Sequence, residues 1–415
     1  MLDKTIIKNI SSLFSLRIAG YIIPLITLPY LVRSLGAHEF GVMSFAIAFV
    51  QYFITFVNFG FDLSATKKVS EKRDDKKHIS KIFFNVTTVR VLFCIIGVIA
   101  IYFISLMSDT IRDNFYIIMS AYLSVVGVAI FPQWLFQGKE ELGVISIVRV
   151  ISQVLTIPLL YVFVKSPLDT QNATLISSLP FIFIALFSMM VVYKKRWIIF
   201  VYPTYKEMKD EMKDSYHLFI SNVAGSLYTT TVPVVLGFVS NPTNVAIYTA
   251  AHKLVFAAQG LYSPITTAMF PRISLNYTKS HSIAVVTIKK LLKVTLLLGG
   301  ATSLSIVILA PYIINMLFGS GYEKSVVVMM ILSPLPLIVS LGNVLGIQTL
   351  IVFGYKKQFM SAVLYIGMFS LVSLIPASYY WQSYGAAICV VSSELLISLS
   401  MLYLVNKKKI LSKEL

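Results

Sequence analysis

Four basic side chains interrupt stretches of the sequence that are otherwise almost wholly apolar. They are Arg17, Arg90, Arg149 and Lys253. A charge at the centre of a lipid bilayer costs about 2.5–3.5 kcal/mol, so four cost on the order of 10 kcal/mol if no anion lies near them. Arginine is well suited to phosphate, because its planar guanidinium donates two parallel hydrogen bonds. The chemistry that these residues could do is therefore the binding of an anionic ligand inside a membrane.

The same apolar stretches contain only two carboxylates, Asp62 and Glu394. Two anions cannot neutralise four cations. In one interpretation the arginines extend to the inner headgroups and Lys253 pairs with Glu394. In the other, which we favour, the four cations line a water-filled cavity and bind an anionic cargo. If transport is coupled to H⁺ or Na⁺, Glu394 is the first candidate for the coupling carboxylate and Asp62 the second.

The composition predicts an all-α polytopic membrane protein. Of 415 residues 57% are hydrophobic and 13% charged, whereas soluble domains carry about 25% charged residues. A transmembrane helix needs about 20 apolar residues. The first apolar segment has no small-residue cleavage site after it, so we expect it to be retained. Twelve segments reach the length of about 20 mostly apolar residues that a transmembrane helix needs. They are 10–32, 40–62, 82–106, 115–136, 143–164, 172–193, 215–239, 244–269, 291–318, 326–350, 359–380 and 385–404.

Basic residues predict the orientation of these helices, because cytoplasmic loops collect Lys and Arg. With the N-terminus inside, 27 of the 35 Lys and Arg residues fall in cytoplasmic stretches and four in outside loops. Both termini are therefore expected in the cytoplasm. This distribution accounts for the net charge of +17 through topology and contacts with anionic lipids, so no nucleic-acid partner is expected.

The longest cytoplasmic connection divides the predicted helices into two groups of six. We expect an N-terminal lobe at 1–193, a linker at 194–214 and a C-terminal lobe at 215–415 that ends in a short basic tail. Residues 35–70 align without a gap with residues 239–274, and each segment holds the second helix of its half. Such a duplication favours two six-helix lobes around a central cavity.

Motifs for catalysis or cofactor binding are missing from the sequence. There is no GxxxxGK[ST] loop for ATP, no CxxC or HExxH metal motif, and no plausible Ser, His and Asp set. We therefore expect no enzyme activity, no catalytic residues, no cofactor and no metal.

Four segments together resemble a known family: "LPYLVRSLGAHEFG" at 28–41, "PQWLFQGKEELG" at 132–143, "SPITTAMFPRIS" at 263–274 and "SPLPLIVSLGNVLGIQTL" at 333–350. They are similar to segments of the bacterial polysaccharide exporters of the Wzx type, the O-antigen flippases. These belong to the multidrug/oligosaccharidyl-lipid/polysaccharide exporter superfamily. The resemblance spans essentially the whole chain, with the segments in the same order.

The resemblance implies a cargo and a location. The cargo would be an oligosaccharide unit on undecaprenyl diphosphate, flipped from the cytoplasmic to the periplasmic leaflet of the bacterial inner membrane for lipopolysaccharide biosynthesis. The polysaccharide polymerase and the chain-length regulator would be partners, beside membrane lipids. By helix position, Arg17 and Lys253 match the cavity cations of such flippases, and Arg90 and Arg149 match less closely. Multidrug members commonly carry a carboxylate in the first helix, where this sequence has Arg17, which argues against drug export.

Two alternatives stay open at this point. A flippase for the lipid-linked peptidoglycan precursor would share the architecture and the cationic residues. A membrane-embedded polysaccharide polymerase or ligase would share the hydrophobicity, but such enzymes typically have a long periplasmic loop. The predicted outside loops here are each about ten residues or fewer, which argues against the enzyme.

Overall fold

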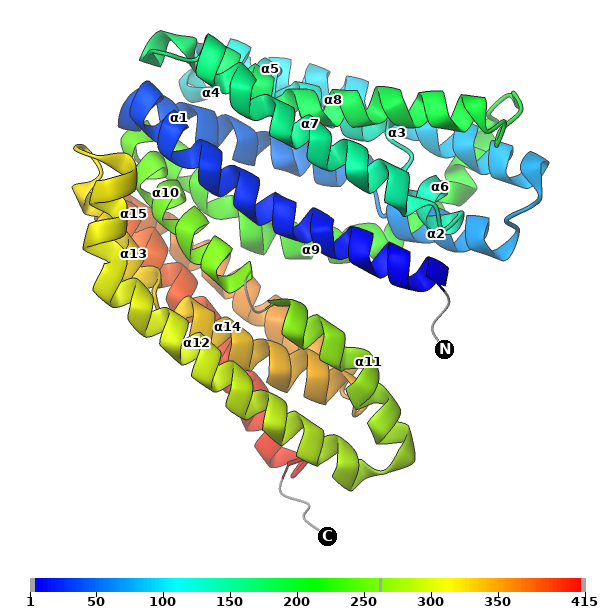
Figure 1. Ribbon diagram of the computed structural model, residues 1–415. Coiled ribbons are helices and arrows are strands. Elements are labelled where there is room, and N and C mark those ends of the chain that lie inside the picture. The colour runs from blue at the N-terminus through cyan, green and yellow to red at the C-terminus, as the bar shows by residue number, and fades with distance from the viewer. Residues whose placement is uncertain (1–3, 261–262, 412–415) are drawn as a thin grey trace. The chain divides into compact units, whose positions relative to one another are not determined.

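A computed structural model describes residues 4–260 and 263–411, and its side chains from residue 23 onward except 221, 224–229, 263–265 and 267–268. This part of the chain is built from helices and contains no strand (Figure 1). The helices are α1 (Lys4–Asn58), α2 (Phe61–Glu71), α3 (Lys76–Met107), α4 (Asp109–Asp113), α5 (Phe115–Ile130), α6 (Gln133–Gly138), α7 (Leu142–Phe163), η1 (Pro167–Asp169), α8 (Thr170–Lys194), α9 (Tyr205–Val239), α10 (Pro242–Gly260), α11 (Ser263–Lys279), α12 (His281–Phe318), α13 (Glu323–Leu332), α14 (Leu335–Asn343), η2 (Val344–Ile351) and α15 (Lys356–Lys407).

The chain divides into two compact units, Met1–Val234 and Val235–Leu415. The division falls inside α9, whereas the sequence places a linker at 194–214. The physical reason lies in the first turns of α9, which pack on the first unit. There Lys68 of α2 pairs with Glu211 at 2.9 Å and with Asp214 at 2.7 Å. Most of α9 therefore belongs to the first unit, although it follows the predicted linker.

In the first unit α1, α5, α7 and α8 pack side by side, α3 packs against α5, and α2 against α6 (Figure 1). The core at one end of this unit is aromatic and fully enclosed: Phe61, Trp134 and Phe136 are each buried. Burying three large aromatic side chains fixes the two short helices α2 and α6 against α3. This packing holds in place the helix breaks on either side of α2 and α6.

In the second unit α12 packs against α11, α13 and α14, and α15 packs against α10, α13, α14 and η2. The order α10, α11, α12 repeats the order of the second half of α1, α2 and α3 in the first unit. The repeat of residues 35–70 at 239–274 thus falls on corresponding elements. Long helix α15 is bent at Gln382, whose backbone has φ 52° and ψ −133°. A non-glycine residue seldom adopts a positive φ, so the packing around the bend must hold it.

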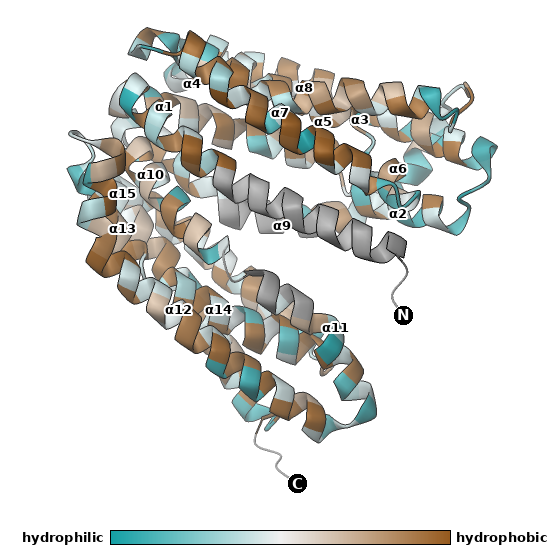
Figure 2. Cartoon of the chain, in the orientation of Figure 1, coloured by the Kyte–Doolittle hydropathy of each residue, from teal (hydrophilic) through white to brown (hydrophobic). Residues whose placement is uncertain are grey.

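The protein is a multi-pass membrane protein. Among the described residues, eight helical stretches are long and apolar enough to cross a membrane. Figure 2 shows hydrophobic residues along α7, α8 and α12 and hydrophilic residues in the loop between α2 and α3. The eight stretches are Ile23–Glu71, Lys76–Met107, Phe115–Gly138, Leu142–Phe163, Pro167–Lys194, His281–Phe318, Glu323–Ile351 and Lys356–Lys407.

These stretches differ in number from the twelve predicted segments for two reasons. The stretch of 49 residues contains the end of the predicted segment 10–32 and all of 40–62, joined across a kink at Gly36. The stretch of 52 residues contains the predicted segments 359–380 and 385–404, joined across a kink at Gln382. Straight helices of that length would be about 75 Å long, against an apolar bilayer thickness of about 30 Å. The predicted segment 215–239 falls on α9, and the predicted segment 244–269 begins in α10 and ends in α11. Parts of these two segments, namely the side chains of residues 221 and 224–229 and all of residues 261–262, lie outside the described residues. Neither segment is therefore among the eight stretches, and the described piece Thr230–Val239 of α9 is apolar.

Candidate anion-binding site

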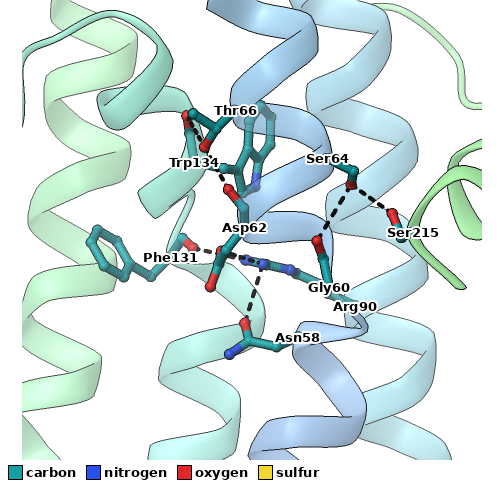
Figure 3. Close-up of polar contacts among 9 residues, drawn as sticks. All are labelled: Asn58, Gly60, Asp62, Ser64, Thr66, Arg90, Phe131, Trp134 and Ser215. Carbon is teal, nitrogen blue, oxygen red and sulfur yellow. Dashed lines mark hydrogen bonds and ion pairs between the residues drawn. The ribbon is translucent and has the colours of Figure 1, made fainter. Parts of the chain in front are cut away.

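Arg90 of α3 forms the centre of a polar cluster in the first unit, where its side chain is almost completely buried (1% exposed). Its Nη1 donates a hydrogen bond to the carbonyl oxygen of Phe131 at 3.1 Å. Its Nη2 donates to Oδ1 of Asn58 at 3.2 Å and to Oδ1 of Asp62 at 2.7 Å. Figure 3 shows these three acceptors around the guanidinium. A buried charge requires such compensation, because an unpaired one costs several kcal/mol.

Two breaks in the helices supply these acceptors. Pro132 cannot donate a backbone hydrogen bond and biases Phe131 towards extended backbone, and Phe131 has φ −73° and ψ 112°. Its carbonyl is therefore turned out of the α5 helix and accepts from Arg90. The second break, at Phe59 and Gly60 with φ 42° and 78°, ends α1 at Asn58. Arg90 thus forms hydrogen bonds to residues at two helix breaks, one at the end of α5 and one at the end of α1.

Gly60 is required at the second break by space as well as by conformation. A Cβ on Gly60 would lie 2.7 Å from Cβ of Leu218 and 2.9 Å from the carbonyl oxygen of Ser215, both in α9. Beside it, Ser64 Oγ lies 2.6 Å from Ser215 Oγ (Figure 3). The first turn of α2, which holds Asp62, is therefore fixed by α9 on one side.

On its other side α2 is fixed by α6. The Thr66 hydroxyl donates to the carbonyl of Asp62 at 2.5 Å and lies 3.3 Å from the carbonyl of Trp134. Asp62 occupies the first turn of α2, where the helix dipole favours a negative charge. The carboxylate that pairs with Arg90 is held in one position by local structure.

A cavity of about 200 Å³ opens beside this cluster. Asn58, Asp62 and Arg90 form part of its wall, and Arg149 of α7 faces it from another side. Gln51 and Gln133 add amide groups. The remaining lining residues are Ile54, Gly127, Val128, Phe131, Phe181 and Ile184.

Arg149 gives this cavity its positive charge. The carboxylate of Asp62 is used by Arg90 at 2.7 Å and attracts Arg149 over a longer distance. Within the part of the chain that the structure describes, no hydrogen-bond acceptor or carboxylate contacts the half-buried Arg149 guanidinium. Two cations and one anion leave a net charge of +1, and the donors of Arg149 are available to a ligand.

The structure brings together three of the residues singled out in the sequence, namely Arg90, Arg149 and Asp62. Arg90 does not extend to the headgroups: its burial and its three acceptors correct that interpretation for this residue. Lys253 and Glu394 lie in the second unit, half-buried on α10 and α15, and these two helices pack against each other. Arg17 falls in α1, and its side chain lies outside the described residues.

Asn58, Gln51 and Gln133 were not singled out in the sequence. The signal that could have identified them is a polar residue close to a helix break inside an apolar segment, such as Asn58 before "FGFD" and Gln133 after "FP". The Phe131 carbonyl could be inferred only from the proline that follows it.

The cavity can bind a small anion or one anionic group of a larger ligand. Pockets for drug-sized ligands have about 300–1,000 Å³, so about 200 Å³ is too small for an oligosaccharide. Guanidinium and amide donors suit the oxygens of a phosphate. Among the described residues, no group of three or more His, Cys, Asp or Glu side chains is placed to hold a metal ion.

Known proteins resemble this chain in sequence and in fold. The protein named "Putative O-antigen transporter" of Escherichia coli (strain K12) is 35% identical over 404 residues, which cover 97% of each chain. Two solved structures share the fold at low identity. An inward-facing multidrug resistance MATE family transporter of the MOP superfamily has a TM-score of 0.73 at 14% identity, covering 97% of this chain and 99% of its own. The lipid II flippase MurJ, in an inward closed conformation, has a TM-score of 0.71 at 15% identity, covering 98% of this chain and 89% of its own.

The family described as "Polysaccharide biosynthesis protein" matches residues 6–276. This match includes α3, α5 and α7, and with them both arginines of the cavity. Together with the identity to the Escherichia coli relative, it assigns the chain: the protein belongs to the polysaccharide biosynthesis protein family.

Proposed function

We propose that this protein is a flippase that moves O-antigen oligosaccharide units linked to undecaprenyl diphosphate across the bacterial inner membrane. The units would pass from the cytoplasmic to the periplasmic leaflet by alternating access. We further propose twelve membrane crossings in two six-helix lobes around a central cavity, with both termini in the cytoplasm. The family match and the named relative support the substrate class.

The observation that carries the proposal is Arg149, a cation beside a cavity of about 200 Å³ whose one carboxylate already pairs with Arg90. A diphosphate is the most strongly charged part of a lipid-linked sugar. We infer that one of its phosphates accepts hydrogen bonds from Arg149 when the carrier enters from the cytoplasmic side. The sugars stay outside the cavity, which is too small for them, and the lipid tail stays in the bilayer.

Arg90 has a positioning role in this proposal. Its Nη1 and Nη2 donate to Asp62, Asn58 and Phe131, so it shapes the cavity wall and holds Asp62. Arg17 and Lys253 remain proposed contacts of the same anionic cargo, and Glu394 and Asp62 the proposed carboxylates for coupling to H⁺ or Na⁺. Glu394 is the first candidate for that role and Asp62, which pairs with Arg90, is the second.

The proposal is tested in a deletion strain that carries wild type, Arg149→Ala or Arg149→Lys. Loss of a charge-assisted contact costs about 1.5–3 kcal/mol, so Arg149→Ala should reduce the rate of export about 10- to 100-fold. Arg149→Lys keeps the charge and should retain part of the activity. Surface polysaccharide is measured at equal protein abundance. The matched control is Arg112→Ala, because Arg112 is exposed and pairs with its neighbour Asp109.

Full export by Arg149→Ala would contradict the proposed role of the cavity. The same strain separates the two flippase alternatives. Loss of O-antigen export should remove surface polysaccharide and leave growth intact, whereas loss of a peptidoglycan-precursor flippase should lyse the cells. Partnership with the polysaccharide polymerase and the chain-length regulator is proposed on the substrate class alone.

A further inference from the structure

We propose that residues 193–206, which we call the strap, bind the surface of a membrane that contains anionic phospholipids. The strap joins α8 to α9 and reads "YKKRWIIFVYPTYK". It contains four basic residues and no acidic residue. This surface is separate from the cargo site, and its binding does not depend on which cargo is transported.

One side of the strap is anchored to the first unit. The backbone N–H of Ile199 donates to Ser80 Oγ of α3 at 2.9 Å. The Trp197 ring packs against Phe136 with centroids 5.1 Å apart, and Nζ of Lys195 lies 5.1 Å from the Trp197 centroid. The strap therefore has a fixed inner side, although it contains no regular structure between α8 and α9.

The other side of the strap presents aromatic rings to the surroundings. Tyr193, Phe200, Tyr202 and Tyr205 are 83%, 67%, 79% and 78% exposed. The rings of Phe200 and Tyr202 are in contact, with centroids 4.8 Å apart. Four exposed aromatic side chains within 13 residues are unusual for a surface in water, whereas aromatic residues collect where a membrane meets water.

Contacts with α3 place the strap at the edge of the bilayer. Phe200 packs on Phe84, with ring centroids 5.1 Å apart. Further along α3, Val91, Leu92 and Ile95 are exposed apolar residues in a helix that can cross a membrane. Residues seven or eight apart lie on one face of a helix, so Phe84 continues the face of Val91 and Leu92. Phe200 thus lies at the end of the lipid-facing side of α3, next to its basic first turns.

The charge of the strap favours an anionic surface. Lys195 pairs with Glu141. Lys194, Arg196 and Lys206 are exposed and form no ion pair with any residue that the structure describes. Each such residue near an anionic leaflet strengthens binding about fivefold. An acidic protein segment would pair with the basic residues of the strap. It would not explain why the exposed aromatic rings of the strap lie at the end of the lipid-facing side of α3.

The experiment measures the depth of a nitroxide label on the strap in full-length protein. The label is placed by Thr204→Cys in a background with Cys94→Ala and Cys389→Ala, because both native cysteines are buried and Thr204 is exposed. The protein is reconstituted in phosphatidylcholine alone or mixed with phosphatidylglycerol. Collisions with oxygen report contact with lipid, and collisions with a water-soluble nickel complex report contact with water.

We expect the label to lie at headgroup depth only when phosphatidylglycerol is present. Replacing Lys194, Arg196 and Lys206 by Gln should lower the ratio of bound to detached strap on the order of a hundredfold. Replacing Lys407, Lys408 and Lys409 by Gln removes the same charge elsewhere and should leave the label unchanged. A transport assay on these variants separates failure of this inference from failure of the proposed function.

Three results would overturn the inference. The label could stay exposed to water in both lipids, or it could be buried equally in both and be insensitive to the three basic residues. It could also become protected only when soluble cytoplasmic proteins are added, which would assign the strap to a protein partner.

Discussion

At the scale of single residues, the two arginines of the cavity differ in their surroundings and therefore in their roles. Arg90 is 1% exposed and has three acceptors. Arg149 has a cavity in front of it. The sequence identifies both as costly charges in apolar helices, but nothing in the sequence distinguishes the paired one from the other. That difference depends on where two helices are broken.

Removal of Asp62 and removal of Arg90 should destabilise the protein by different amounts. Asp62→Ala leaves a guanidinium buried without its anion, which costs about 3–5 kcal/mol. Arg90→Met leaves a carboxylate whose side chain is 33% exposed, beside the cavity and Arg149, so it should cost less. Thermal unfolding in detergent compares the two variants. Equal loss of stability, or a greater loss for Arg90→Met, would contradict the assignment of Arg90 as the buried partner.

At the scale of elements, the fold could be predicted from the sequence as far as hydrophobic segments reveal it. The segments at 82–106, 115–136 and 143–164 correspond closely to α3, α5 and α7. The short helices α2 and α6 were not predicted separately, because six to eleven residues are too few to give a hydropathy signal. The site depends on those two helices, since they follow the breaks at Gly60 and Pro132. Only contacts across the chain, such as Gly60 with Leu218, show why the breaks are kept.

The start of α9 is a further element that the sequence does not place. Its Glu207 accepts hydrogen bonds from Lys81 Nζ at 2.7 Å and Asn85 Nδ2 at 3.1 Å, both on α3. The hydrogen bond from Lys81, followed by that from Asn85, lowers the pKa of the Glu207 carboxyl below its ordinary value. Burial instead raises the pKa of nearby Glu211. These contacts hold the start of α9 on the first unit.

The contribution of Glu207 to stability should depend on pH. A carboxyl whose pKa is lower in the folded state stabilises the fold above its unfolded pKa of about 4.3, and this contribution is lost as pH falls through the folded value. The difference in melting temperature between wild type and Glu207→Gln should be present at neutral pH and shrink below about pH 4.

Glu71→Gln is the control for this measurement, because Glu71 is exposed and its contact with Lys67 is 3.9 Å long. It should show little difference from wild type at either pH. If the difference in melting temperature between wild type and Glu207→Gln is the same at neutral pH and below about pH 4, the Lys81 contact does not stabilise α9 through charge.

At the scale of the whole molecule, the composition and the basic loops predict a multi-pass membrane protein. Four segments resemble the polysaccharide exporters, and the comparisons confirm the polysaccharide biosynthesis protein family. The number of crossings is harder to obtain, since α1 and α15 continue through kinks and α10 is too polar for a hydropathy criterion. The polar residues of α10, Lys253 among them, are the reason that a hydropathy criterion does not recognise this helix. It is also what we would expect of a helix that contacts an anionic cargo.

The central claim is that the protein flips a lipid because of the charge of its head. The most direct measurement uses purified protein in proteoliposomes with a fluorescent lipid-linked oligosaccharide, and a membrane-impermeant quencher reports which leaflet it occupies. We predict flipping of the diphosphate-linked sugar by wild type, a rate about 10- to 100-fold lower for Arg149→Ala, and no flipping of a neutral lipid with the same sugar. Equal rates for the charged and the neutral lipid, or for wild type and Arg149→Ala, would contradict the claim.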